Sequence, residues 1–196
     1  MTDTAASGVI ADIRAVLRAI GHVLRNDAAH ARAAAPDNNR ALIVSFIALF
    51  ISYVVEWWLN ILLDPQGRLE LVEPGLSGEL AALALLLLIW VGVTALFAWL
   101  YGRLRLLRRY FTTANWLTAI TEPFFTLLIL GTNAIAGEPA AMMVVLVTLV
   151  LILWIIVRTA RILLDITTAR AIVLLIALLI AIFTLLILVG GISLTD

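Results

Sequence analysis

The chain has 196 residues, of which 64% are hydrophobic and 13% are charged, and its formal net charge is zero. An average soluble domain holds about 45–50% apolar and about 25% charged residues, so this composition excludes an ordinary soluble domain, and the zero net charge gives no reason to expect a nucleic-acid partner. Because cysteine is absent, disulfides, thiolate metal sites and cysteine nucleophiles are excluded as well.

Residues 1–40 are predicted to form a cytoplasmic N-terminal region built on an amphipathic helix. Within residues 8–33, apolar side chains recur every three or four positions, as on one face of a helix; they are Ile10, Ile13, Leu17, Ile20 and Leu24. Such a helix can lie in the lipid headgroup layer, pack on the ends of membrane spans or dock on a partner. The sequence leaves these three alternatives open.

Five long apolar runs follow, at residues 41–63, 80–101, 116–135, 140–157 and 171–192. Each has about the 20 residues that a helix needs to cross about 30 Å of hydrocarbon. Lipid offers the backbone no hydrogen bonds, and the runs lack the alternation of strands, so they are predicted to be helices. The expected fold is an all-α polytopic membrane protein with a five-helix domain over residues 41–196.

The basic residues are all arginines, and they gather on one side of these runs. Arg14, Arg18, Arg25, Arg32 and Arg40 precede the first run, and Arg170 precedes the last. The loops after the second and fourth runs carry the residues expected to contact lipid headgroups or partners: Arg103, Arg105, Arg108, Arg109, Arg158 and Arg161. Only Arg68 falls on the other side. Since cytoplasmic loops collect arginine, the N-terminus is predicted inside and the C-terminus outside.

The absence of lysine indicates the codon usage of a GC-rich bacterial genome. Together with the predicted topology, it favours the bacterial inner membrane, with a periplasmic C-terminus.

The third run contains proline, which removes a helical hydrogen bond and restricts the residue before it. A span that began at Pro123 would be too short, so the sequence predicts a helix that starts near Trp116 and is distorted at Pro123. Glu138 and Pro139 open the fourth run soon afterwards, and proline suits a first helical turn. The third and fourth spans are therefore predicted to be antiparallel neighbours.

Two carboxylic acids lie inside predicted spans, and intramembrane acids are functional candidates by default. Glu56 and Glu122, with Pro123 and Asn133, form the set of intramembrane polar candidates. Counted from the predicted span starts, the two acids differ in depth by roughly 13 Å, so they are not expected to pair. The alternative to a functional role is a hydrogen bond that packs helices together.

No catalytic, cofactor or metal site is predicted. His22 and His30, the only histidines, lie outside the spans, which argues against haem or zinc within the membrane. Phosphate-loop, zincin and serine-hydrolase motifs are absent from the sequence. An enzyme is therefore not expected, and no small-molecule substrate is identified.

The layout over residues 8–192 resembles the Yip family of Rab/Ypt-interacting membrane proteins and their bacterial five-span relatives. Residues 110–124, YFTTANWLTAITEPF, resemble the family's approach to its third span, and residues 161–172, RILLDITTARAI, its approach to the last. The Asp-Leu-Tyr-Gly-Pro motif of eukaryotic members is absent, so Rab binding does not carry over. The resemblance implies a non-catalytic scaffold or partner-recruiting protein.

Two other functions stay open at this point. The chain suits an accessory subunit of a larger respiratory, photosynthetic or secretory complex, because its predicted helices are apolar all round. It also suits a small oligomeric transporter or channel, with Glu122 and the distorted third span along a pathway. In every case the expected partners are membrane lipids and other membrane proteins or further copies of the chain.

Overall fold

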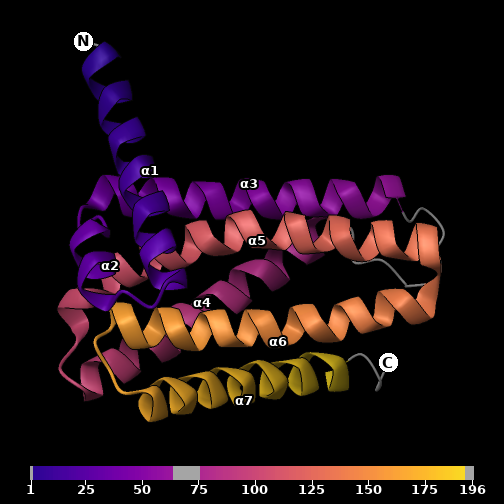
Figure 1. Cartoon of the computed structure of the whole chain (residues 1–196). Coiled ribbons are helices and arrows are strands. Elements are labelled where there is room, and N and C mark those ends of the chain that lie inside the picture. Colours follow the sequence, from indigo (N-terminus) through magenta and orange to yellow (C-terminus); the bar gives the residue numbers. More distant parts are fainter. Residues whose placement is uncertain (1, 64–75, 193–196) are drawn as a thin grey trace.

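The computed structural model describes residues 2–63 and 76–192, and every regular element within them is helical (Figure 1). The helices are α1 (Thr2–Leu24), α2 (Ala28–Ala34), α3 (Asn39–Leu63), α4 (Leu76–Leu100), α5 (Leu107–Ala136), α6 (Glu138–Leu163) and α7 (Thr168–Ile192), with a short 3-10 turn at Leu104–Leu106. Five of the described helices, α3 to α7, are long and apolar enough to cross a membrane. The predicted all-helical, five-span class is confirmed.

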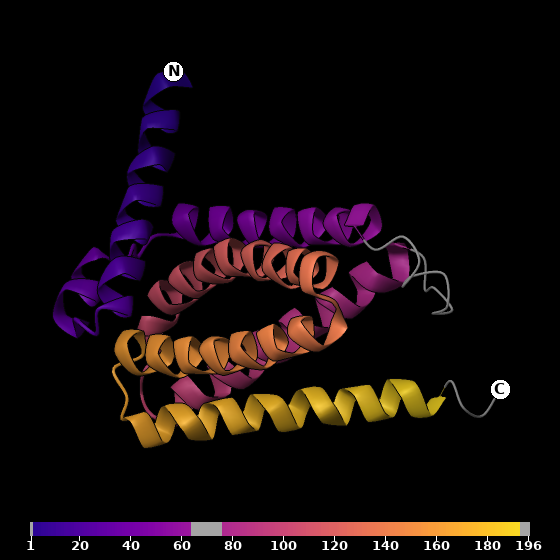
Figure 2. The same cartoon turned by 45° about the vertical axis from the view of Figure 1, so that its right-hand side comes forward.

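The largest error in the predicted spans concerns α5, which begins at Leu107 and not near Trp116. Apolar runs mark the part of a helix that fits in hydrocarbon, whereas the helix itself extends into the headgroup layer. Arg108 and Arg109 lie in the first turn of α5. Because these residues are charged, the apolar pattern does not include the start of the helix. Pro123 lies inside the continuous helix, whose ribbon follows an arc in Figure 2.

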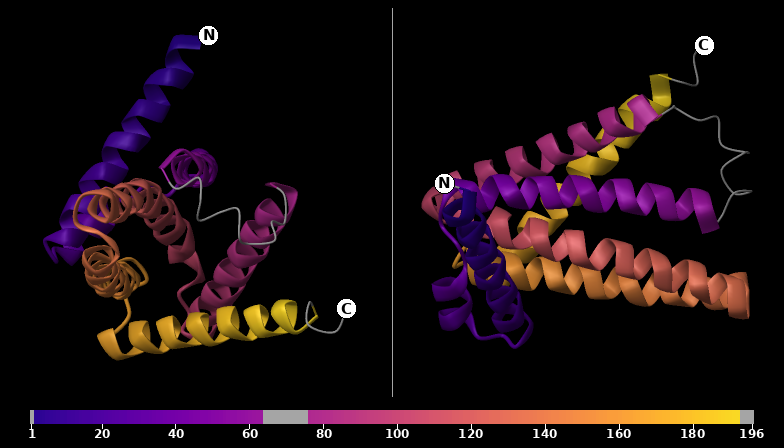
Figure 3. Two further views of the ribbon diagram at one scale, coloured as in Figure 1. Left: turned by 90° about the vertical axis from the view of Figure 1, so that its right-hand side faces the viewer. Right: turned by 90° about the horizontal axis from the view of Figure 1, so that it is seen from above.

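The five long helices pack in the order α3, α5, α6, α7 and α4, as an open arc (Figure 3). The most extensive contact joins α3 to α5, which run in the same direction because α4 returns the chain between them. Helices α5 and α6 form the predicted antiparallel hairpin. Gly137 makes its turn with a φ of 80°, a conformation that glycine adopts without a steric penalty.

The N-terminal region forms two helices, so the prediction of one helical stretch over residues 8–33 is wrong. Asn26 adopts a φ of 63°, and Asp27 then caps α2 by accepting a hydrogen bond from the His30 backbone N–H. Asparagine tolerates the left-handed conformation, and aspartate is a preferred N-cap, so these two residues explain the break. The first helix, α1, lies crosswise over the ends of α3, α5 and α6 (Figure 1).

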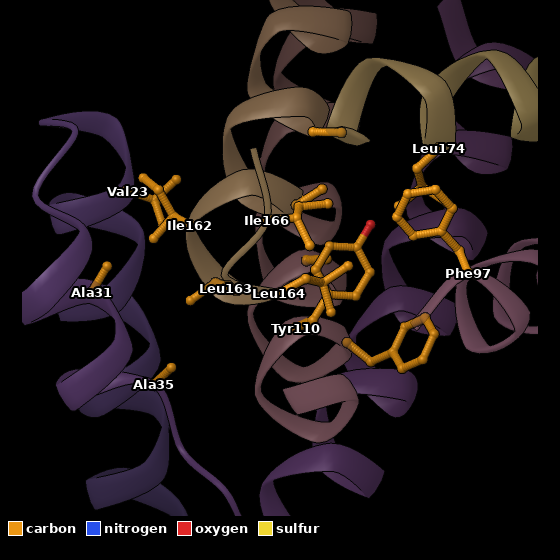
Figure 4. Packing of buried hydrophobic residues seen from close by; sticks show 14 of the residues in the cluster. Val23, Ala31, Ala35, Phe97, Tyr110, Ile162, Leu163, Leu164, Ile166 and Leu174 are labelled. Carbon is orange, nitrogen blue, oxygen red and sulfur yellow. The ribbon is translucent and has the colours of Figure 1, made fainter. Parts of the chain in front are cut away.

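The main core lies at the end of the spans where α3, α5 and α7 begin, which we call the arginine-rich end. There Val23 of α1 and Ala31 of α2 face Ile162 and Leu163 of α6, with Tyr110 behind them (Figure 4). Away from this end the helices cover one another little. No more than 17% of the residues in the apolar stretch of any candidate span are buried by the described chain. Most of the span surface is therefore left for lipid or partner helices.

Candidate functional site

Two hydrogen bonds join the parallel helices α3 and α5 within their spans. The Asn115 amide Nδ2 donates to the Ser45 hydroxyl at 3.0 Å, and the Thr126 hydroxyl donates to the Glu56 carboxylate at 2.9 Å. Both pairs are separated by 70 residues in the sequence. The two helices therefore keep one register over about three turns, from Ser45 to Glu56 on α3.

The same register places Ser52 of α3 opposite Glu122 of α5. Ser52 is buried, and its hydroxyl has no hydrogen-bond partner among the described residues. We call these three facing pairs of side chains the polar ladder, and each pair a rung. From α3 and α5 respectively, the rungs are Ser45 with Asn115, Ser52 with Glu122, and Glu56 with Thr126.

The predicted depth difference of roughly 13 Å between Glu56 and Glu122 is too large. The prediction counted from residue 116, nine positions after the true start of α5. The hydrogen bond between Thr126 and Glu56 sets Glu56 level with Thr126, four residues beyond Glu122 in α5, so at the helical rise the two acids differ in depth by about 6 Å. The structure therefore places the two acids about one helical turn apart in depth.

The remaining intramembrane candidates differ in their surroundings. Pro123 is half-buried beside Glu122 in α5. Asn133 is exposed near the far end of that helix, where its backbone carbonyl accepts a hydrogen bond from the Gly137 N–H, so it belongs to the helix end and not to the polar ladder. Sequence reasoning missed the hydroxyl and amide members. The signal was available, because positions i, i+7 and i+11 are polar in both helices.

We expect the first rung to contribute measurably to the association of α3 with α5. Hydrogen bonds between membrane helices contribute about 0.6 kcal/mol on average and up to about 1.7 kcal/mol. A double-mutant cycle of Asn115→Ala and Ser45→Ala, measured by unfolding in detergent micelles, should give a coupling energy in that range. Thr184→Ala is the control, because the Thr184 hydroxyl bonds only its own helix. A coupling energy of zero would show that the hydrogen bond between Asn115 and Ser45 does not stabilise the pair of helices.

Two aspartates join separate segments at the arginine-rich end. Asp165, which follows α6, accepts a hydrogen bond from Arg32 of α2 and lies 3.4 Å from Arg103. Asp37, which precedes α3, lies 3.2 Å from Arg109 and 3.7 Å from Arg108. These ion pairs tie the N-terminal segment to the segments that follow α4 and α6 and to the first turn of α5.

The other arginines expected to contact lipid or partners have different surroundings. Arg161 donates to the Asn26 side chain and so also holds the turn between α1 and α2. Arg158 lies over the Trp154 ring at 4.4 Å from its centroid, and Arg105 is exposed. Three of the six candidates, Arg103, Arg108 and Arg109, thus pair with aspartates of this chain, and Arg161 pairs with an asparagine.

Helix α1 has one face on the spans and one face uncovered. Val16, Ile20 and Val23 are buried against the bundle. At about 100° per residue, the exposed Ile10, Leu17 and Leu24 lie beside that buried face, and the exposed arginines lie farther round. We call this uncovered surface the α1 strip; it consists of Ile10, Leu17, Leu24, Arg14, Arg18 and Arg25.

Comparison of the chain with family models, curated proteins and solved structures finds no match. The polar ladder offers carboxylates and hydroxyls along about three turns of the spans, where acids are costly to ionise and can hold a proton or a cation. The α1 strip offers an apolar surface with arginines at its edge, which suits a lipid headgroup layer or a protein.

Proposed function

We propose that the chain is a non-catalytic, Yip-like protein of the bacterial inner membrane, which acts as a scaffold and recruits partner proteins at its arginine-rich end. One observation carries the proposal: α1 is fixed across the ends of the spans while the α1 strip stays uncovered. The one-sided distribution of arginine supports a cytoplasmic position for this end and for the N-terminus.

The attachment of α1 makes the strip a preorganised surface. The Arg40 Nε donates to the Asp12 carboxylate at 2.8 Å, and the Asn38 Nδ2 donates to the same carboxylate at 3.2 Å, so the start of α3 holds α1. A surface that is already ordered avoids part of the entropic cost of binding. Leucine and isoleucine anchors beside arginines fit an amphipathic partner segment that carries acidic residues.

A photo-crosslinking side chain at Leu17, in cells, tests the recruitment. We expect discrete protein adducts at Leu17 that disappear when Arg14→Glu and Arg18→Glu reverse the charge of the strip. The matched control is the same crosslinker at Ile47, an exposed position in α3 that we expect to face lipid. If Leu17 gave the same adducts as Ile47, or if charge reversal left its adducts intact, recruitment at the α1 strip would be ruled out.

Reporter fusions at residue 196 test the orientation separately. A phosphatase that is active only in the periplasm should be active there, and a fluorescent protein that folds only in the cytosol should stay dark. Five crossings with the arginine-rich end inside require this result. Cytosolic fluorescence would overturn the orientation and, with it, the place where partners would be recruited.

A second candidate function is a small oligomeric transporter or channel, and the polar ladder favours it. Glu56 and Glu122 lie about one helical turn apart in depth on the neighbouring helices α3 and α5, and intramembrane acids are candidates for a proton or cation site. The described helices form an open arc, so a second copy would be needed to close a pathway around the polar ladder. Proton or cation flux in liposomes that disappears in Glu122→Gln would support this function. Flux that survives in Glu122→Gln would show that transport does not use the polar ladder.

The third candidate is an accessory subunit of a larger respiratory, photosynthetic or secretory complex. It is favoured by the small buried share of every candidate span, since neighbouring subunits would cover the remainder. Co-migration with such a complex on a native gel separates this function from an independent scaffold.

A further inference from the structure

Three potential metal ligands meet where α1 gives way to α2. His22 lies in the last turn of α1, Asp27 is the N-cap of α2, and His30 lies in the first turn of α2. Asp27 Oδ2 is 3.3 Å from His22 Nδ1 and 2.8 Å from His30 Nδ1. The two imidazole rings are stacked, with centroids 5.3 Å apart and planes inclined by 22°. One ligand atom from each residue lies within 4.8 Å of the others.

The fold creates this arrangement without a metal. The left-handed conformation of Asn26 reverses the chain, and Arg161 of α6 donates to the Asn26 side chain and holds the turn. Asp27 is oriented by the hydrogen bond that it accepts from the His30 backbone N–H at 3.3 Å. The carboxylate is therefore oriented by the backbone, and the turn brings the end of α1, with His22, to the start of α2, with His30.

We propose that His22, Asp27 and His30 bind a divalent transition-metal ion of the zinc type, through the two Nδ1 atoms and the carboxylate. Ligand atoms about 2.0–2.2 Å from a tetrahedral zinc ion lie about 3.3–3.6 Å from one another. The 3.3 Å between Asp27 and His22 matches this range, and the 2.8 Å between Asp27 and His30 would lengthen by about 0.5 Å on metal binding. Imidazole nitrogens favour zinc and its neighbours over calcium and magnesium, which prefer oxygen ligands. A fourth position stays open for water or for a partner's side chain.

The state of the individual groups supports metal binding. The His22 Nδ1 atom is buried and makes no hydrogen bond among the described residues, so it is available as a ligand. His30 is exposed, which gives an ion access to the cluster. A bound ion would clamp α1 to α2 beside the α1 strip.

The test uses the full-length protein in mild detergent, without a histidine tag. Zn²⁺ is titrated in competition with a chromogenic chelator, and Co²⁺ is followed by its visible absorption. We expect one ion per chain and the intense bands of tetrahedral Co²⁺. His22→Gln, His30→Gln and Asp27→Asn should each weaken binding at least tenfold; asparagine keeps the N-cap of α2. Glu138→Gln, at an exposed acid of the opposite end, should bind as the parent does.

Two results would overturn the proposal. The first is a parent protein that binds no more Zn²⁺ than the His22→Gln/His30→Gln double variant. The second is an NMR titration of the parent in which Zn²⁺ leaves the imidazole resonances of both histidines unchanged. Because the second measurement uses only the parent chain, it decides the question even where a variant fails to fold. Neither result depends on whether the α1 strip recruits a partner.

Discussion

Replacement of Phe111 by alanine is expected to lower the free energy of unfolding by about 3–5 kcal/mol, the usual cost of truncating a buried phenylalanine. Phe111 is only 6% exposed. Its ring meets the Trp90 ring edge-on at 5.3 Å and lies at the same centroid distance from Tyr110. The substitution would therefore open a cavity in the core that joins α4, α5 and α6 to the N-terminal helices.

Phe124→Ala is the matched control, because it removes the same side chain from the same helix. Phe124 is 61% exposed, so its truncation leaves no enclosed cavity and should cost less than about 1 kcal/mol. Unfolding of both variants in detergent micelles, followed by tryptophan fluorescence, measures the difference. Equal losses for the two variants would show that the core does not lie at the arginine-rich end.

The spans could be predicted because burial in lipid imposes a length and a composition on each helix. The ends of the helices could not be predicted in the same way. Arg108 and Arg109 interrupt the apolar pattern, yet they belong to the first turn of α5. A helix continues through the headgroup layer, where charged side chains reach water or an ion-pair partner such as Asp37. The length of an apolar run is therefore a lower limit on the length of the helix that contains it.

The polar ladder shows a second limit of the sequence. An isolated list of polar positions does not reveal which helices are neighbours, and α3 lies beside α5 and not chiefly beside α4, its successor. Once the parallel pairing is known, the equal spacing of Ser45 and Glu56 on one helix and of Asn115 and Thr126 on the other explains the two hydrogen bonds. The repeated spacing was visible, but its meaning depends on the packing.

The arginines expected to face lipid or partners show how one residue type serves two purposes. A one-sided charge distribution predicts the orientation of the spans. At the arginine-rich end, Asp165 also joins Arg32 of α2 to Arg103 after α4, so part of this charge is used inside the molecule. The sequence could not separate the two uses, because Arg32 and Asp165 are 133 residues apart.

Ala31→Phe is expected to release α1 and α2 from the spans. Ala31 has no exposed surface and packs in the same core cluster as Val23 of α1 and Ala160 of α6, so a phenyl ring cannot fit without displacing α2. Overpacking of this kind costs about 1–3 kcal/mol. Since the parent chain lacks cysteine, a single Val23→Cys substitution can report the opening through its rate of reaction with a maleimide.

The labelling rate at residue 23 should rise about 5- to 150-fold in Ala31→Phe, because each 1.4 kcal/mol changes the open population tenfold. Ala33→Phe adds the same ring to an exposed position of the same helix and should leave the rate unchanged. Equal rates in the two variants would show that α2 is not anchored through Ala31. If Ala31→Phe also abolishes the adducts at Leu17 while Ala33→Phe keeps them, recruitment requires a strip that is held against the spans.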